Sequence, residues 1–295
     1  TLHVQFNKYD RADVCHYHTV HFPFYLSTFM PNRGRKVGFV HFLPETLEDS
    51  LNRPKIAKAV FYRYVIAFYK RMDQLVVVNP AFIPKLEAYG IPKDHITYIP
   101  TFVSTALFHP VDAAKKKQLQ QKYQYPDRFT VLGSGQVQVR KGVFDFIELA
   151  KRNPDVQFIW TGGFSFGRIT DGYEQLKQVV DNPPANLSFP GIVPREHLVD
   201  YYNMADLFLL PSYNELFPMS VLEAFSSETP VLLRDLDLYQ AIIDGDYAAA
   251  KDVDEMNDWI QKLKQQPEEL ATLKAKSQRA AAYYSEDRLL KIWQD

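Results

Sequence analysis

The stretch that decides the fold reads Asp206-Leu-Phe-Leu-Leu-Pro-Ser-Tyr-Asn-Glu215-Leu-Phe-Pro-Met-Ser220-Val-Leu-Glu223-Ala-Phe-Ser226. Leu207–Leu210 form a short apolar run, which predicts a buried strand over Asp206–Leu210, and residues 220–226 predict a helix. Pro211 and the polar residues after it separate the two elements. The stretch therefore predicts a strand, a loop and a helix in succession, with Glu215 in the loop and Glu223 in the helix.

The same alternation extends in both directions along the chain. The expected strands are Asp13–Tyr17, Val37–Phe42, Leu75–Val78, Ile96–Ile99, Thr130–Gly133, Val156–Trp160, Leu187–Phe189, Asp206–Leu210 and Pro230–Leu233. The expected helices include Pro54–Met72, Ala81–Tyr89, Gly172–Val180, Pro194–Asn203, Ser220–Ser226 and one that carries Val143, Phe146, Ile147 and Ala150 on one face. This spacing predicts an α/β fold with parallel sheets covered by helices on both faces. In such sheets, ligands bind beyond the carboxyl ends of the strands.

The composition is that of a globular protein with two domains. The chain has 295 residues, of which 46% are apolar and 23% are charged, so disordered and coiled-coil classes are excluded. A single cysteine, Cys15, excludes an internal disulfide framework and indicates a reducing compartment. Arg63 interrupts the best apolar run, Ala59–Tyr69, well short of the roughly 18 residues of a membrane span. The sequence therefore predicts a soluble or peripheral protein.

The charge is distributed unevenly. Residues 1–110 contain 13 Lys and Arg against 8 Asp and Glu, whereas residues 111–295 contain 21 against 27. A basic first half can meet either nucleic acid or an anionic membrane surface, and the charge alone leaves both open. No nucleic-acid-binding module is recognisable in the sequence, which disfavours the first.

The chain starts with an apolar alternation. Leu2, Val4 and Phe6 alternate with polar residues, as in a half-buried strand, and residue 1 is threonine. Because a fold rarely opens inside a strand, we expect further sequence upstream of Thr1.

The loop and helix start around Glu215 suit an anionic ligand that carries hydroxyl groups. Free N–H groups at a helix start attract phosphate, and a carboxylate accepts hydrogen bonds from sugar hydroxyls. A nucleotide-sugar combines both features. Taken alone, however, two glutamates eight positions apart are usually solvated surface acids.

Several further motifs change that interpretation, because together they cover most of residues 130–235. They are Arg140-Lys141-Gly142 at a helix start, Phe189-Pro-Gly191-Ile-Val193-Pro194, Ala205-Asp-Leu-Phe-Leu-Leu-Pro-Ser212, and the glutamate pair itself. With them the chain resembles the family 4 retaining glycosyltransferases of the GT-B fold. The resemblance implies two Rossmann-like parallel-sheet domains that face a cleft, with the first strand, loop and helix of the N-terminal domain upstream of residue 1. The expected domains are residues 1–110 for the acceptor and membrane, residues 111–282 for the nucleotide-sugar, and a helix in 283–295 that returns to the N-terminal domain.

The resemblance also implies a role for individual residues. Lys141 would hold the leaving diphosphate, Glu215 would contact the donor sugar, and Glu223 would accept from the ribose hydroxyls. The nucleobase would pair with main-chain atoms of Gly191, Ile192 and Val193, and phosphate donors would come from Phe217, Met219 or Ser220, since Pro218 has no N–H. The family has an arginine shortly before the lysine, so here either Gln136 takes its place or Arg140 supplies the charge. His41, at the end of an expected strand, would lie under the reacting sugar.

Other signals are interpreted as structural. Cys15, His16, His18 and His21 imitate a zinc site, but this segment resembles the end of a family strand. The Asp-x-Asp pairs at Asp235 and Asp252 follow late strands, where a metal role has no counterpart, so no metal is expected. Gly133-Ser-Gly135 lacks the third glycine of a dinucleotide fingerprint. We therefore expect no cofactor, with UDP-sugar as a substrate.

The expected helix Pro54–Met72 has two interpretations. The segment from Leu51 to Met72 contains six basic residues and no acidic one. The basic residues are Arg53, Lys55, Lys58, Arg63, Lys70 and Arg71. The helix is either a core helix with solvated charges, or an in-plane helix on an anionic membrane, where each cation contributes roughly 1 kcal/mol.

The runs Val37–Leu47, Gly133–Val143 and Trp160–Gly167 are similar to the branch that makes diglycosyl-diacylglycerols, the lipoteichoic acid anchors of Gram-positive bacteria. This resemblance implies transfer of glucose or galactose from a UDP-sugar to a monoglycosyl-diacylglycerol, by a peripheral enzyme on the cytoplasmic face of the membrane. The alternatives are a family 4 enzyme that uses diacylglycerol or a soluble sugar as acceptor, and a non-catalytic nucleotide-binding module.

Overall fold

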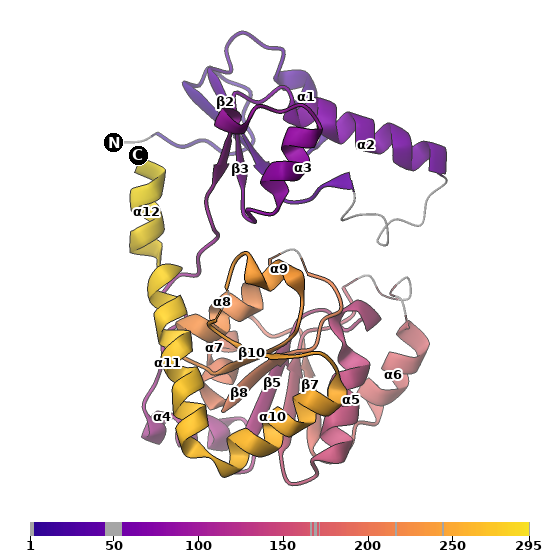
Figure 1. Ribbon diagram of the computed structural model, residues 1–295, viewed down its shortest axis with the longest axis vertical. Coiled ribbons are helices and arrows are strands. Elements are labelled where there is room, and N and C mark those ends of the chain that lie inside the picture. Colours follow the sequence, from indigo (N-terminus) through magenta and orange to yellow (C-terminus); the bar gives the residue numbers. More distant parts are fainter. Residues whose placement is uncertain are drawn as a thin grey trace. The chain divides into compact units, whose positions relative to one another are not determined.

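The structure is a computed structural model that describes residues 3–44, 55–165, 167, 170, 172–215, 217–243 and 245–294. It divides into two compact units, Thr1–Pro100 and Thr101–Asp295. Each unit is built on a parallel sheet (Figure 1). The α/β class predicted from the alternation is confirmed. The unit boundary precedes the predicted one at residue 110 by ten residues.

The first unit contains four strands in the order β1-β2-β3-β4, all parallel. The strands are β1 (Val14–Tyr17), β2 (Arg35–Val40), β3 (Gln74–Val77) and β4 (Ile96–Tyr98). The helices are α1 (Phe22–Ser27), α2 (Lys55–Tyr69) and α3 (Phe82–Ala88). Gly90 follows α3 with φ +81°, the left-handed conformation in which a glycine commonly ends a helix.

The predicted strand at Leu2–Phe6 is wrong within the part that the structure describes. Residues 3–13 contain no strand, and both Val4 and Phe6 are exposed. Leu2 lies outside the described residues. Alternation alone does not make a strand, because a strand also needs a neighbour for its backbone hydrogen bonds and a surface that covers its apolar face. Residues 3–6 have neither among the described residues.

The second unit has a six-stranded parallel sheet in the order β10-β9-β8-β5-β6-β7. Its strands are β5 (Thr130–Ser134), β6 (Gln157–Thr161), β7 (Leu187–Gly191), β8 (Leu207–Leu210), β9 (Val231–Arg234) and β10 (Ala248–Ala250). Its helices are α4 (Ala113–Lys122), α5 (Val143–Arg152), α6 (Tyr173–Asp181), α7 (Arg195–Met204), α8 (Met219–Ser226), α9 (Asp237–Gln240), α10 (Val253–Gln265), α11 (Pro267–Tyr283) and α12 (Glu286–Gln294). The strand order reverses at β5, which lies between β6 and β8.

The core of the second unit forms where predicted. Val143, Phe146, Ile147 and Ala150 of α5 are all buried, as their spacing predicts. Phe146 meets the ring of Trp160 edge-on, with 5.0 Å between ring centroids. Gly133 must be a glycine here, because a Cβ at that position would lie 2.3 Å from the Trp160 ring. The carboxyl-terminal part of β5 therefore packs directly against the Trp160 side chain of β6.

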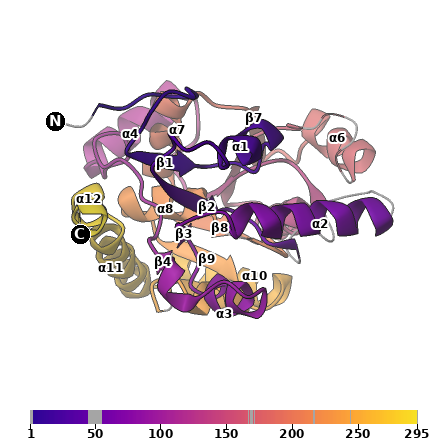
Figure 2. The same cartoon turned by 90° about the horizontal axis from the view of Figure 1, so that it is seen from above.

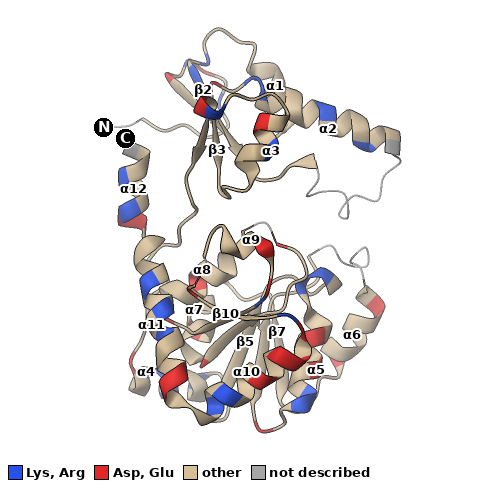
Figure 3. Ribbon diagram, viewed as in Figure 1, with Lys and Arg blue, Asp and Glu red and all other residues tan. Residues whose placement is uncertain are grey.

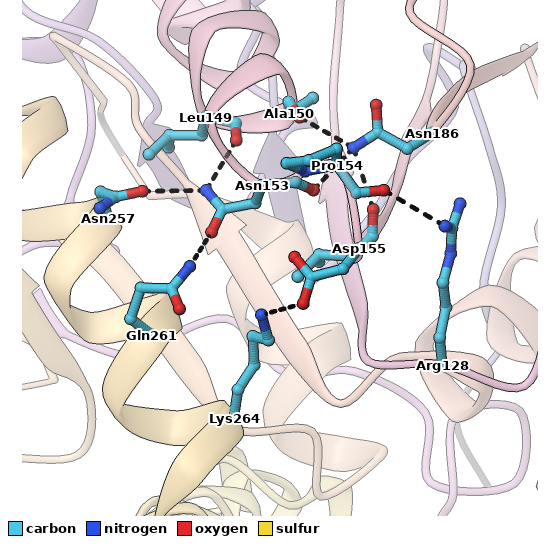
Figure 4. Close-up of polar contacts among 11 residues, drawn as sticks. Arg128, Leu149, Ala150, Asn153, Pro154, Asp155, Asn186, Asn257, Gln261 and Lys264 are labelled. Carbon is cyan, nitrogen blue, oxygen red and sulfur yellow. Dashed lines mark hydrogen bonds and ion pairs between the residues drawn. The ribbon is translucent and has the colours of Figure 1, made fainter.

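A polar cluster ties α5, β6 and α10 together at the amino end of β6 (Figure 4). The Asn153 amide donates to the Leu149 carbonyl at 2.8 Å and to Asn257 at 2.9 Å, and Gln261 donates to Asn153. The Asn186 amide donates to the carbonyl oxygens of residues 150, 153 and 156, all within 3.0 Å. These side chains satisfy buried backbone carbonyls at the edge of the sheet opposite the carboxyl ends of the strands. Their role is structural.

The helix α12 lies inside the predicted helical segment 283–295, and its return to the first domain stays a prediction. No helix in the described ranges is long and apolar enough to cross a membrane.

Candidate active site

The candidate site lies at the carboxyl ends of β5 and β8, where the strand order reverses. Backbone hydrogen bonds tie its loops together: Gly135 N donates to Thr161 O at 2.9 Å, and Gly162 N donates to Gly191 O at 2.8 Å. Tyr213 N donates to Arg140 O at 2.9 Å. The loops after β5, β6, β7 and β8 therefore form one connected surface at the position where ligands bind in open α/β sheets.

The centre of this surface is an ion pair. Lys141 Nζ lies 2.5 Å from Glu215 Oε1, although 74 positions separate the two residues in sequence. Glu215 has a side chain 5% exposed and Lys141 one 13% exposed. Arg140 Nη1 lies 3.9 Å from the other Glu215 oxygen and donates to the Asn214 carbonyl at 2.6 Å. The structure thus brings together Lys141 and Glu215, to which the family resemblance assigns the diphosphate and the donor sugar.

Two glycines allow this close approach. Gly142 has φ +71°, and a Cβ there would lie 2.1 Å from the Pro211 carbonyl oxygen. Gly162 has φ +129°, and a Cβ there would lie 1.9 Å from the Gly135 carbonyl oxygen. Any other residue at either position would push the loops apart. Gly142 therefore allows the backbone next to Lys141 to approach Pro211, and this approach positions the lysine near Glu215.

Glu223 is buried on α8 and has two partners. The Tyr202 hydroxyl donates to Glu223 Oε2 at 2.9 Å, and Arg195 Nη1 lies 3.1 Å from Oε1. Burial raises the pKa of the Glu223 carboxyl, and the bonds from Tyr202 and Arg195 oppose that rise. The guanidinium of Arg195 also lies 5.2 Å from the centre of the Phe108 ring. Glu223 is thus a fixed acceptor rather than a solvated surface acid.

The remaining predicted donor-side residues line the same edge of the sheet. Gln136 is half-buried and accepts from Gln138 at 3.1 Å, while Arg140 is exposed. Met219 and Ser220 begin α8, with Phe217 just before them. Gly191 ends β7 with φ +79°, and Ile192 after it is exposed. The predicted roles of these residues stay predictions.

Sequence reasoning missed a buried network under the loop that follows β8. Arg234 pairs with Asp145, and it donates to the carbonyl oxygens of Pro211 at 3.1 Å and Lys251 at 2.8 Å. The Tyr213 hydroxyl donates to Asp145 at 2.8 Å, and its ring lies 4.2 Å from the guanidinium. Pro211 also touches Gly142, so the network fixes the loop that carries Glu215. The available signal was a charged residue directly after the apolar run of β9.

Two buried hydroxyls near this loop were also missed. Tyr239 and Ser212 are fully buried, and neither hydroxyl has a hydrogen-bond partner within the described ranges. Burial, and then the charge of Glu215, raises the pKa of Tyr239 well above its ordinary value. A neutral hydroxyl that lies near Glu215 with its hydrogen bond unmade is suited to a polar ligand.

In the first unit, His41 belongs to a row of rings that we call the imidazole row, formed by His16, His18, Phe39 and His41. The ring of Phe39 stacks on His18 with 3.9 Å between centroids and on His41 with 6.1 Å. Burial lowers the pKa of all three imidazoles, and repulsion from its two neighbours lowers the pKa of His18 further. No group of three metal-ligating side chains in the described residues lies close enough to hold a metal ion.

The six basic residues predicted to meet a membrane differ in their surroundings. The helix α2 contains no acidic residue (Figure 3). Arg63 on this helix is exposed, and so is Lys70 directly after it. Lys58 is half-buried and has an interaction within the protein. Arg71 is half-buried and donates to the Thr28 carbonyl at 3.1 Å. Arg53 and the side chain of Lys55 lie outside the described residues.

The Asp-x-Asp pairs also have structural explanations. Asp252 accepts from Glu255 N at 3.0 Å and so caps α10. Asp254 pairs with Arg152 at 2.5 Å. Asp237 is in the first turn of α9, where a carboxylate favours the helix start.

Comparison with known proteins places this chain in a family. Residues 3–107 match the family model described as Glycosyltransferase Family 4, and residues 114–280 match that described as Glycosyl transferases group 1. Alpha-galactosylglucosyldiacylglycerol synthase of Streptococcus pneumoniae (strain ATCC BAA-255 / R6) is 53% identical over 96% of this chain and 76% of its own length. Processive diacylglycerol alpha-glucosyltransferase of Acholeplasma laidlawii is 38% identical over 39% of this chain and 33% of its own length.

Solved structures agree on the fold. HepE of Anabaena, in complex with UDP and glucose, has a TM-score of 0.79 at 16% identity and covers 96% of this chain and 76% of its own. Sucrose-phosphate synthase from Thermosynechococcus elongatus has a TM-score of 0.74 at 19% identity, over 95% of this chain and 71% of its own. At such identities the likeness concerns the fold alone. With two parallel-sheet α/β domains, two matching family models and a relative at 53% identity, the chain belongs to the family 4 glycosyltransferases of the GT-B fold.

Proposed function

We propose that the protein transfers a hexose, galactose in the first place, from a UDP-sugar to monoglucosyl-diacylglycerol with retention of the anomeric configuration. The observation that carries this proposal is 53% identity across 96% of the chain to a protein named alpha-galactosylglucosyldiacylglycerol synthase. The diacylglycerol glucosyltransferase among the relatives supports a lipid acceptor as well. UDP as the nucleotide is compatible with this fold, since HepE, which shares the fold, binds UDP and UDP-glucose in its structures.

The geometry around Lys141 suits the departure of a diphosphate. In the reaction, the bond between C1 of the sugar and the β-phosphate oxygen breaks, and a bond between C1 and the acceptor hydroxyl oxygen forms. The hydroxyl proton passes to the departing phosphate oxygen, so the charge balances without an additional base. The ammonium of Lys141 and the N–H groups of Met219 and Ser220 would stabilise the negative charge that develops on the phosphate.

Glu215 and Glu223 would bind different parts of the donor substrate. Glu215 would accept from hydroxyls of the hexose and favour the positive charge that develops on the sugar ring. Glu223, held by Tyr202 and Arg195, would accept from the ribose hydroxyls. The turn Gly191–Val193 would pair with the uracil, and Arg140, rather than the neutral Gln136, would add the second positive charge. Phe217 would lie beside the phosphates.

The first unit would receive the acceptor. His41 would lie beside the reacting sugar, and Arg63 and Lys70 would attract anionic lipid, so the protein would act as a peripheral enzyme on the cytoplasmic face of the membrane. We further propose that the reaction needs no metal, because Lys141, Arg140 and a helix start supply the positive charge that a metal would otherwise bring.

Mass spectrometry of the lipid products tests the proposal. The full-length protein is incubated with UDP-galactose or UDP-glucose and mixed micelles that contain monoglucosyl-diacylglycerol or diacylglycerol. One added hexose on the monoglucosyl lipid, with UDP-galactose preferred, is expected. Product from diacylglycerol alone would mean that the enzyme adds the first hexose to the lipid and not the second. UDP binding without any lipid product would leave a soluble acceptor or a non-catalytic nucleotide-binding role.

A further inference from the structure

Arg195, the first residue of α7, lies in the candidate site, although no role was predicted for it. Its Nη1 lies 3.1 Å from Glu223 Oε1, and its side chain is 56% exposed, whereas that of Glu223 is 5% exposed. Helix α7 has both α4 and α8 as neighbours (Figures 1 and 2). The start of α7 thereby reaches the carboxylate of α8. The ion pair joins a cation at the surface to a buried acid of the donor site.

The guanidinium of Arg195 is in contact with two groups, although more than half of the side chain is exposed. Besides Glu223, it meets the Phe108 ring, whose centre is 5.2 Å away. Phe108 is fully buried, and its carbonyl oxygen accepts from the Ser226 hydroxyl at 2.6 Å. The ring is therefore a fixed surface for the cation. A side chain held in this way loses little further freedom when Glu223 binds a ligand.

The oxygens of Glu223 keep unused capacity to accept hydrogen bonds. In the described residues, Oε2 accepts from the Tyr202 hydroxyl at 2.9 Å, and Oε1 has Arg195 as its partner. A carboxylate oxygen has two lone pairs, so each oxygen can accept one more hydrogen bond. Two such positions on one fixed carboxylate match two neighbouring hydroxyl groups, such as those of ribose. Without Arg195 one oxygen would lose its partner, and the carboxylate could turn about its last bond.

The charge of Arg195 also favours the ionised form of Glu223. Burial raises the pKa of the Glu223 carboxyl, and the influences that oppose this rise are Tyr202 and Arg195, the titratable or charged groups that face it in the described residues. Removal of the cation would raise this pKa further, so that protonation would extend to higher pH. A protonated carboxyl donates through one oxygen and no longer offers two equivalent acceptors.

We propose that Arg195 is a positioning residue that makes Glu223 a charged, two-point acceptor for the vicinal hydroxyls of the nucleotide ribose. The inference rests on the proposed UDP-sugar donor, which it deepens by naming the residue on which ribose recognition depends. Arg195 acts through Glu223, and the role requires no contact of its own with the nucleotide.

Calorimetric binding of UDP to the intact protein, without an acceptor, tests the proposal. At pH 8 we expect Arg195→Met to weaken UDP binding about tenfold, because the acceptor loses a charge-assisted hydrogen bond that orients it. Lys122→Met is the matched control: it removes a cation that is 53% exposed and pairs with Asp200 of the same helix at 2.8 Å. The control should bind UDP like the wild type, and an unchanged stoichiometry would show that both variants are folded. The loss should be smaller for 2′-deoxy-UDP, which lacks one of the two hydroxyls, and an equal loss for both nucleotides would overturn the proposal.

The pH dependence of binding distinguishes this role from a merely structural one. The ratio of wild-type to Arg195→Met affinity should increase at least about threefold from pH 8 to pH 5.5, because Glu223 is protonated at higher pH in the variant. The titration of UDP itself cancels in this ratio. In a Glu223→Gln background the ratio should not change with pH, and Arg195→Lys, which keeps a positive charge, should restore the wild-type pH dependence.

Two outcomes would overturn the role of Arg195: wild-type affinity in Arg195→Met, or an affinity ratio that is the same at both pH values. Formation of the lipid product is measured separately. If the pH-dependent loss of UDP affinity is found and the wild type makes no lipid product, the proposed reaction is refuted and the role of Arg195 stands.

Discussion

The ion pair of Arg234 with Asp145 controls the loop that carries Glu215, and its removal gives a quantitative prediction. Arg234→Met keeps most of the apolar stem of the side chain and removes the guanidinium. Asp145, with a side chain 15% exposed, then loses its cation, and the Pro211 and Lys251 carbonyls lose their donors. The carboxylate is left with the Tyr213 hydroxyl as its hydrogen-bond donor within the described ranges.

The size of the effect follows from the burial of both partners. Removing one member of a buried pair costs about 3–5 kcal/mol, and the partial exposure of these two side chains, 10% and 15%, favours the lower end. For a domain of this size each kcal/mol lowers Tm by about 2–4 °C, so a fall of about 6–20 °C is expected. Asp145→Leu alone should cost a similar amount. The double variant should recover at least about 2 kcal/mol of the summed cost, because no unpaired charge remains.

The assay is urea unfolding of the intact protein, followed by the fluorescence of its three tryptophans, Trp160, Trp259 and Trp293. Arg152→Met is the matched control, because its ion pair with Asp254 is exposed and should contribute under about 1 kcal/mol. At a temperature well below Tm, kcat of Arg234→Met should fall about tenfold with little change in KM, since Lys141 and Glu215 would shift slightly apart. A cost under about 1 kcal/mol, or strict additivity in the double variant, would refute this account of the loop.

Four other predictions concern the site and its surroundings. Lys141→Ala and Glu215→Ala should each lower kcat by on the order of a hundredfold or more, and near-wild-type turnover in both would remove them from the reaction. Burial raises the pKa of the Glu223 carboxyl, so the folded state loses stability as the pH rises from below the ordinary pKa of about 4.5 through the raised one. Glu223→Gln should therefore raise Tm more at pH 8 than at pH 4, while KM for the UDP-sugar increases about tenfold, and equal Tm shifts at the two pH values would contradict this. Partial desolvation lowers the pKa of His16, His18 and His41, so the first unit should lose stability as the pH falls below about 6.5. The loss should be small because all three side chains are exposed, and hydrogen exchange in β1 and β2 should show that His18→Gln reduces it. Turnover should survive EDTA, and its loss with restoration by a divalent ion would refute the metal-free mechanism.

Periodicity predicted most of the fold because the second unit is built from strands buried on both faces. The run at 207–210 and one face of α5 are apolar because both are buried in the same core. The local sequence pattern of each element therefore agrees with its place in the fold. The prediction of a strand at Leu2–Phe6 failed because alternation of apolar and polar residues specifies an apolar face but not the element that would cover that face. The short helix α1 was missed since six residues with four aromatic or leucine side chains give too few turns for a periodic signal.

The site residues that belong to recognisable sequence motifs could be predicted. Lys141 and Glu215 were named from their motifs, but only the fold shows that 74 positions of separation become 2.5 Å. Tyr202 and Arg195, which hold Glu223, belong to α7, and neither was part of a motif recognised in the sequence. Arg234 is similarly invisible, because its partner Asp145 comes from a helix two strands away. The contacts of such supporting residues depend on the order of the strands in the sheet, which a motif along the sequence does not specify.

The ion pair at the centre of the site can remain in place while a donor binds. A lysine ammonium has three N–H groups, and Glu215 is the one acceptor bonded to Lys141 in the part of the chain that the structure describes. With its side chain 13% exposed, the ammonium can donate to a phosphate oxygen without leaving the carboxylate. Glu215 then has a further purpose besides contact with the sugar: it holds the cation at one position before substrate arrives. A cation fixed in advance needs no reorganisation as charge develops on the leaving phosphate, so its attraction acts fully in the transition state. Glu215→Gln should accordingly weaken the hydrogen bond that positions Lys141. We expect kcat to fall strongly and the affinity for free UDP, measured as inhibition, to fall less. If Glu215 contacts only the sugar, inhibition by free UDP should be unchanged in this variant.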